Sequence, residues 1–170
     1  MIDERKRERS LCFTGHRTEK LPQTKEDIKA LENKILCEID KAIAKGIDTF
    51  YFGACYGFDL MAAEQVLKRS KLLNLKNPKP IRLIAVIPFE EQAIYWLESD
   101  REKYYDEILP YCDEVITLNT KFKKGCYHER NRYIVDRSSR MIAYYDGSSG
   151  GTAYTIKYAE TKGLDIKNLY

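Results

Sequence analysis

Residues 140–163, RMIAYYDGSSGGTAYTIKYAETKG, contain the pattern that decides the fold. The apolar run at 140–145 is typical of a buried strand, and residues 152–162 have helical periodicity and end at Gly163. Six of the seven residues from 146 to 152 are Gly, Ser or Thr. A hydrophobic strand that turns through a glycine-rich loop into a helix predicts one strand–helix unit of a parallel sheet.

The same alternation of short apolar runs and longer helical runs extends along the whole chain. Strands are predicted at residues 10–14, 48–52, 81–87, 114–118 and 140–145, with a short edge strand at 166–170. Helices are predicted at residues 28–43, which Gly46 closes, and at 59–73, 101–109, 127–138 and 152–162. The polar segment 74–80 returns the chain to the third strand.

Strands that alternate with helices predict an α/β fold, a Rossmann-like three-layer sandwich with a mainly parallel sheet. No internal repeat or interdomain linker interrupts this order. We therefore expect residues 1–170 to form a single domain, with residues 1–9 as a charged N-terminal extension.

Composition excludes several classes of protein. With 170 residues, of which 44% are hydrophobic and 32% charged, the chain resembles a folded globular domain rather than a disordered one. The longest apolar stretch, 83–89, is far shorter than the roughly 20 residues that a membrane helix needs. Residues 1–10 carry seven charges, unlike a secretory signal. We expect no membrane partner and a cytoplasmic location.

The cysteine and charge patterns limit the kinds of site. Five cysteines without a CxxC pair, together with two histidines, give no spacing of a zinc site, so we expect reduced thiols, no metal and no cofactor. The net charge of +3 is too small to indicate nucleic acid by itself. Residues 121–140, however, hold seven Lys or Arg against Glu129 and Asp136.

Ligands of open parallel sheets bind at the carboxyl ends of the strands, and glycines mark three of these ends. After the first strand, Gly15 allows close backbone approach to an anion, and His16 and Arg17 follow it; a plain turn with a surface arginine is the alternative. After the second strand, Gly53 and Gly57 lead into a helix whose first N–H groups can face a phosphate.

Two carboxylates follow this second loop. Asp59 either caps its own helix or accepts hydrogen bonds from ligand hydroxyls. Glu64 lies five residues later and about 140° around the helix, so the two are not a preset acid/base pair.

The third loop, DGSSGGT at 146–152, gives the strongest signal. Gly150, Gly151 and Thr152 are predicted to form a phosphate cradle, with a flexible turn capped by Thr152 as the alternative. The loop is neither a Walker A nor a GxGxxG motif. In the basic segment, Arg130 either neutralises ligand phosphates or forms part of a solvated face. Four aromatic residues in or beside these motifs either stack on a base or pack: Tyr56, Tyr95, Trp96 and Tyr127.

Five motifs in this order resemble the YpsA-like family of the SLOG superfamily: CFTGHR, GACYGFDLMAAE, IPFEEQAIYW, ERNRYIVDRS and DGSSGGT. The resemblance covers residues 11–163, and the superfamily includes DNA-processing protein A and the LOG-type phosphoribohydrolases. It implies a Rossmann-like fold with a pocket for nucleotides or nucleotide-derived ligands. The pocket residues that it implies are Gly15, His16, Arg17, Gly53, Gly57, Asp59, Arg130, Asn131, Gly150, Gly151 and Thr152.

The resemblance also separates three functional hypotheses. LOG-type hydrolases have a GTxxE pattern, and Thr155 stands here where their glutamate is expected. The leading hypothesis is therefore a sensor or sequestering protein for an ADP-ribose-like or cyclic ADP-ribose-like signalling nucleotide. A hydrolase of an N-glycosidic or phosphate bond, with Asp59, Glu64 or Glu129 as its carboxylate, is the second. A single-stranded DNA-binding module is the third, and self-association into a homo-oligomer is a further expectation.

Overall fold

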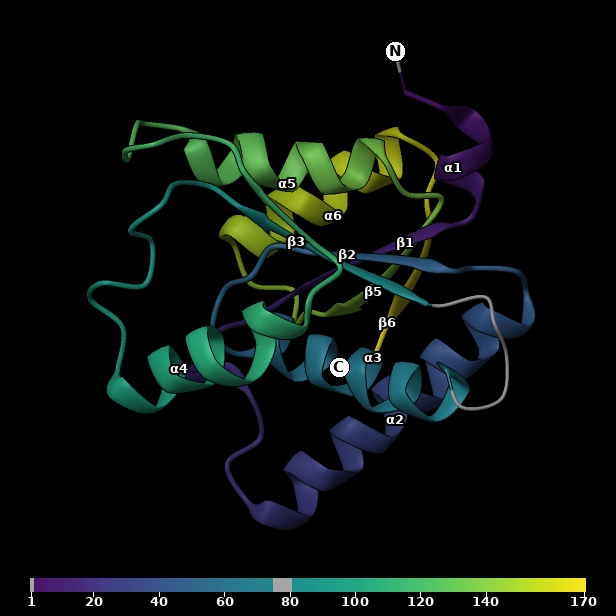
Figure 1. The fold of residues 1–170 in the computed structure, drawn as a ribbon, viewed down its shortest axis with the longest axis horizontal. Coiled ribbons are helices and arrows are strands. Elements are labelled where there is room, and N and C mark those ends of the chain that lie inside the picture. Colours follow the sequence, from purple (N-terminus) through teal and green to yellow (C-terminus); the bar gives the residue numbers. More distant parts are fainter. Residues whose placement is uncertain (1, 75–80) are drawn as a thin grey trace.

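The computed structural model describes residues 2–74 and 81–170, and in these residues six strands form one sheet (Figure 1). The order across the sheet is β4-β3-β2-β1-β5-β6, and each neighbouring pair is parallel. This confirms the predicted α/β fold. The strands are β1 (Ser10–Gly15), β2 (Thr49–Phe52), β3 (Arg82–Ile87), β4 (Glu114–Thr117), β5 (Arg140–Tyr144) and β6 (Asp165–Asn168).

Helices cover both faces of the sheet and complete the predicted three layers (Figure 1). α5 and α6 lie on one face, and α2, α3 and α4 lie on the other. The α-helices are α1 (Glu4–Glu8), α2 (Lys25–Ala44), α3 (Phe58–Asn74), α4 (Glu98–Glu102), α5 (Cys126–Asp136) and α6 (Gly151–Thr161). Three short helical turns are η1 (Thr18–Lys20), η2 (Lys103–Ile108) and η3 (Leu109–Tyr111).

Alternating side chains of the strands form two separate hydrophobic cores. Phe13 and Phe50 are fully buried in the core that α2 and α3 cover. Cys12, which precedes Phe13 on β1, and its partner on β5, Met141, belong to the core beneath α5 and α6. Because successive strand residues point to opposite faces, a sheet buried on both sides has nearly continuous apolar strands. This explains why the strands were visible in the sequence as short apolar runs.

Two predicted elements differ from the structure. The predicted helix 101–109 is part of a longer helical region that begins at Glu98, changes to a π-helical turn at Lys103 and ends at Tyr111. The expected N-terminal extension contains α1, whose carboxylate cap Asp3 accepts from the N–H of Arg5. Residues 75–80 of the predicted connection lie outside the described residues. In the described ranges, no helix is both long and apolar enough to cross a bilayer.

The strand order places a crossover between β1 and β5. From β1 the chain builds the sheet outward through β2, β3 and β4, and it then returns to add β5 and β6 on the other side of β1. At such a switch point the loops after neighbouring strands diverge to opposite faces of the sheet and leave a crevice. The β1 and β5 loops therefore frame the expected ligand position.

Candidate functional site

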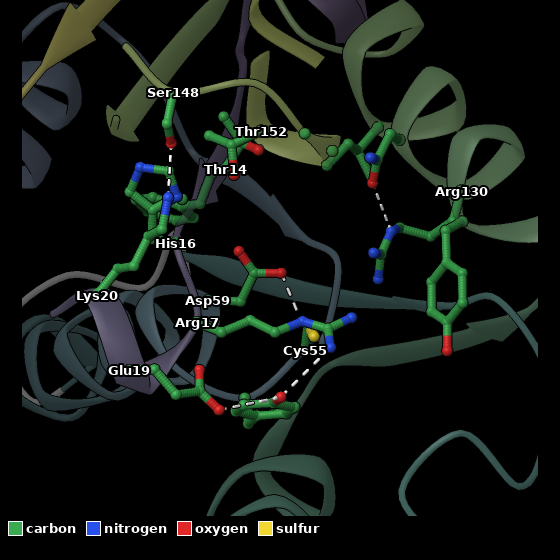
Figure 2. Close-up of a pocket in the computed structure, with 18 of the residues that line it drawn as sticks. Thr14, His16, Arg17, Glu19, Lys20, Cys55, Asp59, Arg130, Ser148 and Thr152 are labelled. Atoms are coloured by element: carbon green, nitrogen blue, oxygen red, sulfur yellow. Dashed lines mark hydrogen bonds between the residues drawn. The ribbon is translucent and has the colours of Figure 1, made fainter. Parts of the chain in front are cut away.

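A cavity of about 420 Å³ opens at this switch point (Figure 2). Its volume lies within the range of roughly 300–1,000 Å³ that is usual for small-molecule sites. The loops after β1, β2 and β5 contribute to it, and α5 supplies one wall. Nine of the predicted site residues line the cavity: Gly15, His16, Arg17, Asp59, Arg130, Asn131, Gly150, Gly151 and Thr152.

The amino terminus of α6 forms one wall of the cavity. Gly150 precedes the helix with φ 143° and ψ −163°, a conformation that is essentially restricted to glycine. Among residues 2–74 and 81–170, no side chain caps the helix, so its first N–H groups are free of side-chain acceptors there. Free N–H groups and the positive end of the helix dipole together form a binding place for an anion.

A polar network connects this loop to the loop after β1. The Nε2 atom of His16 lies 2.7 Å from Oδ1 of Asp146, and the Asp146 carboxylate also accepts from the hydroxyl and the N–H of Ser148. The hydrogen bonds from Ser148, and to a smaller extent the interaction with His16, hold the pKa of Asp146 well below its usual value. Lys20 donates to the Ser148 hydroxyl at 2.6 Å (Figure 2). The ammonium group of Lys20 is thereby held at the cavity wall.

Arg130 enters the cavity from α5 and is only 6% exposed. Its Nη1 group donates to the carbonyl oxygen of Gly53, and its Nε group donates to Oδ1 of Asn131 at 2.7 Å. Asn131 in turn donates to the Thr155 hydroxyl at 2.8 Å, and that hydroxyl donates to the Gly151 carbonyl. A continuous chain of hydrogen bonds thus fixes the guanidinium group relative to the start of α6.

Asp59 faces the cavity from the first turn of α3, next to Arg17 (Figure 2). α3 begins at Phe58, so Asp59 is its second residue and not its N-cap, contrary to the capping interpretation. The carboxylate accepts from the N–H of Cys55 at 3.4 Å. Burial raises the pKa of Asp59 to about 6, and Arg130 and the loop N–H groups only partly oppose this effect. The side chain can therefore exchange a proton near neutral pH.

Arg17 and Tyr56 form the wall beside Asp59. The guanidinium carbon of Arg17 lies 5.0 Å from the centre of the Tyr56 ring, and Nη1 donates to the Tyr56 hydroxyl at 3.3 Å. Tyr56 also packs edge-on against Trp96 at 5.1 Å. Tyr56 lines the cavity and also packs against the hydrophobic core. Both predicted roles of its ring, stacking on a base and packing, are thus geometrically possible.

Two predicted glycines do not line the cavity but make room for residues that do. A Cβ atom on Gly53 would lie 2.6 Å from Nη1 of Arg130, and one on Gly57 would lie 2.6 Å from Cα of Arg17. Each glycine thus allows a site arginine to approach the loop after β2.

The structure also separates the candidate carboxylates. Glu64 pairs with Lys103 at 2.7 Å, and Glu129 pairs with Lys123 at 3.0 Å. Neither glutamate lines the cavity, which leaves Asp59 as the proposed carboxylate that does.

Several lining residues were missed as site residues by sequence reasoning. Lys20 and Glu19 reach the cavity because η1 folds the chain back directly after Arg17. Their place depends on a turn that has no strong sequence signal. Ser148 and Ser149 lie in the predicted cradle loop, and Cys55 lies in the predicted second loop, so their positions could have been included. Thr14 and Phe13 belong to the end of β1, and their sequence pattern predicts a strand without indicating a role in the site.

Comparison with known proteins identifies the family. The model of the YspA SLOG family, YpsA, matches residues 11–168. The chain belongs to this SLOG family. The SPbeta prophage-derived protein YoqJ of Bacillus subtilis (strain 168), described as uncharacterized, is 30% identical over 143 residues, covering 76% of this chain and 80% of YoqJ. A UPF0398 protein of Bacillus cereus (strain B4264) is 29% identical over 145 residues, covering 84% and 73%.

Solved structures share the fold of this SLOG protein. DNA processing protein A from Streptococcus pneumoniae superposes with a TM-score of 0.63 at 18% identity, over 95% of this chain and 50% of that one. The same protein from Helicobacter pylori, described for its single-stranded DNA binding mode, gives 0.57 at 16% identity, over 93% and 64%. The structural genomics target TM1055 gives 0.57 at 14% identity, over 93% and 72%.

Proposed function

We propose that this protein binds a nucleotide-derived ligand of the ADP-ribose or cyclic ADP-ribose type and acts as a sensor or sequestering protein. One observation carries the proposal: the uncapped start of α6 opens into a cavity that three cationic side chains also line, Arg17, Lys20 and Arg130. Two carboxylates, Glu19 and Asp59, line the same cavity. A site that combines cations, a helix terminus and carboxylates suits a ligand with both phosphates and hydroxyl groups.

The arrangement supports a specific orientation of such a ligand. In Figure 2, Thr152 and Arg130 lie on different sides of the open space, and Asp59 faces both. A diphosphate would accept hydrogen bonds from the N–H groups of Gly151 and Thr152, with Arg130 as counter-charge. Asp59, when ionised, would accept from ribose hydroxyls. The ring of Tyr127, which also lines the cavity, offers a face for a base.

Isothermal titration calorimetry tests this proposal with ADP-ribose, cyclic ADP-ribose isomers, NAD and AMP. We expect saturable heat for at least one of them, and none for adenosine, because adenosine lacks the phosphates that α6 would bind. No heat from any phosphate-bearing ligand, with protein that is folded by circular dichroism, would overturn the proposal.

The raised pKa of Asp59, about 6, favours a second candidate, a hydrolase of such a ligand. A protonated carboxyl group inside a cavity can donate a proton to a leaving group. Chromatography of a bound ligand after long incubation distinguishes the two. Products that form with the native protein and not with Asp59→Asn indicate a hydrolase, whereas a ligand recovered unchanged indicates a binding protein.

The fold shared with DNA processing protein A favours a third candidate, single-stranded DNA binding. Binding to the phosphate backbone weakens steeply with salt, because counterions are released. Retention of a fluorescent oligonucleotide at 50 mM salt that is lost at 300 mM would support this candidate. An absence of retention at 50 mM would exclude it.

A further inference from the structure

The segment that follows β3 presents large apolar side chains to solvent. Tyr95 is 95% exposed, Leu97 74% and Ile94 50%. The segment is anchored at Gln92, which is buried and donates to the Ala54 carbonyl at 3.0 Å and to the Tyr104 hydroxyl at 3.1 Å. Contiguous exposed apolar side chains on a rigid support are typical of an interaction surface.

The segment that carries these apolar side chains and the helical region after it are rich in negative charge. Residues 90–107 contain seven carboxylates against Arg101 and Lys103, and Lys103 is already paired with Glu64 at 2.7 Å. Six of the carboxylates are exposed, and in the described part of the chain none of these six has an ion-pair partner. We call these residues, together with Ile94, Tyr95 and Leu97, the acidic patch: Glu90, Glu91, Glu98, Glu102, Asp106 and Glu107.

A groove also lies within the acidic patch. It has a volume of about 230 Å³ and lies along one face of the continuous helical region that α4 and η2 form. Its lining combines carboxylates with an aromatic ring: Glu98, Arg101, Glu102, Tyr105 and Asp106. Such a groove suits a lysine side chain, which has an apolar stem and a cationic end.

The loop before α5 has the opposite character. Residues 121–124, KFKK, form a basic loop in which three exposed lysines flank Phe122, itself 63% exposed. Lys123 pairs with Glu129, whereas Lys121 and Lys124 have no ion pair in residues 2–74 and 81–170. The loop therefore offers two unpaired ammonium groups and one exposed ring, the complement of the acidic patch.

The segment that carries the acidic patch contacts the basic loop at its start. Phe89, at the start of the segment that carries the acidic patch, packs edge-on against Phe122 at 5.6 Å and against Tyr127 at 5.9 Å. Both segments lie at the left edge of the molecule in Figure 1, on the side where the strands end. Because Tyr127 also lines the cavity, the two surfaces meet at the rim of the ligand site.

We propose that two copies of this chain associate through these surfaces, with the basic loop of each copy on the acidic patch of the other. A two-fold axis near Phe89 and Phe122 would form both contacts at once, because a symmetric dimer needs a surface that is complementary to itself. Oppositely charged neighbouring surfaces with exposed aromatic and aliphatic residues meet this condition. A nucleic acid fits less well, since the carboxylates beside the loop would repel its phosphates. This dimer is independent of the ligand proposed above.

Sedimentation velocity measures the association directly. We expect the native protein to be dimeric at micromolar concentration in 50 mM salt and to dissociate at 500 mM, because salt screens exposed charges. Lys121→Glu/Lys124→Glu should raise the dimer dissociation constant at least tenfold, and Glu98→Lys/Glu102→Lys should do the same. The matched control is Lys29→Glu/Lys45→Glu on α2 and at its end, exposed sites far from both surfaces, which should leave the dimer unchanged.

Mixing the two charge-reversed proteins provides the decisive measurement. Each alone brings like charges together, whereas the heterodimer has complementary charges at both contacts, so mixing should restore dimers. A native protein that remains monomeric at 100 μM would overturn the proposal. So would dimers that survive both reversals, or lysine-dependent binding of an oligonucleotide by a monomer, which would assign the basic loop to nucleic acid instead. Circular dichroism establishes that each variant is folded.

Discussion

At the residue scale, hydrogen bonds fix the position of Arg130 in the site. Its guanidinium group donates in two directions, to the Gly53 carbonyl and to Asn131, and it is almost completely buried. Arg130→Lys retains the charge and loses the forked geometry, so we expect about 1.5–3 kcal/mol of lost stability, typical of hydrogen bonds to charged groups. Ligand affinity should fall at least tenfold. Urea unfolding and calorimetry measure the two effects.

Arg132→Lys is the matched control for this change. Arg132 lies two residues later on α5, is exposed, and donates to the Tyr154 hydroxyl at 2.9 Å outside the cavity. An exposed polar contact of this kind contributes less than about 1 kcal/mol. Equal losses of affinity in the two variants would contradict the placement of Arg130 in the site.

Asp59 should make the stability of the protein depend on pH. Its pKa in the folded protein is about 6, above the reference value of 3.8, so the folded state binds more protons than the unfolded state between these values. Stability from this group is therefore full below pH 4 and is lost as the pH rises through 6, by at most about 3 kcal/mol. In Asp59→Asn this loss should disappear. Urea unfolding of both proteins from pH 4.5 to 8 gives the difference, and parallel curves would contradict the assignment.

The sequence located those site residues that directly follow a strand. Gly15, His16 and Arg17 could be predicted because the end of β1 is clear, and the β5 loop was predicted for the same reason. The roles of Gly53 and Gly57 could not be read from local sequence. A glycine that admits a ligand and one that admits a neighbouring arginine have the same local pattern, and only the tertiary contacts with Arg130 and Arg17 distinguish them.

At the scale of elements, α6 positions the proposed phosphate site through Gly150, the residue that precedes it. Gly150→Ala forces a side chain into a backbone conformation that costs about 1–3 kcal/mol, although no atom of the described residues beyond its chain neighbours lies within 4 Å of the added Cβ atom. The helix start should shift to relieve this strain. We therefore expect both lower stability and at least tenfold weaker ligand binding, measured by thermal unfolding and calorimetry.

The other end of the same helix supplies the control. Gly163 follows α6 with φ 71°, and in the part of the chain that the structure describes an added Cβ would likewise meet nothing within 4 Å. Gly163→Ala should lower stability by about 1 kcal/mol, as for other residues placed in this left-handed region, and leave ligand affinity unchanged. Weaker binding in this variant would mean that α6 acts through its overall position and not through its amino terminus.

The sequence predicts the bounds of helices and strands that have a clear apolar periodicity to within a few residues. The elements that it does not predict have a physical reason. In the region from Glu98 to Tyr111 the helix type changes twice, so a single 3.6-residue period does not describe it. α1 is only five residues long and contains no buried residue. The sequence of α1 has no apolar pattern, and the capping residue Asp3 is the main local signal that a helix begins there.

At the scale of the whole molecule, the two ends of the parallel sheet carry different features. Both proposed surfaces, the cavity and the dimer contact, lie where the strands end. The opposite end carries the contacts of the N-terminal segment: the Arg7 side chain donates to the Lys162 carbonyl at 2.9 Å, and Ser139 donates to the Glu8 carbonyl at 3.0 Å. Contacts at one end of this sheet can therefore be lost, with a fall in the stability of the protein, while the geometry of the other end stays the same.

Deletion of residues 2–8 tests this separation. The deletion removes α1 and its hydrogen bonds to Lys162, Ser139 and Ser10, so we expect a loss of about 2 kcal/mol. For a chain of this length that corresponds to a fall in Tm of roughly 4–8 °C by calorimetry. Ligand affinity and the dimer dissociation constant should each stay within about twofold of the native values, because both sites lie at the opposite end of the sheet. A marked change in either would show that α1 is coupled to the site through the strands that it precedes.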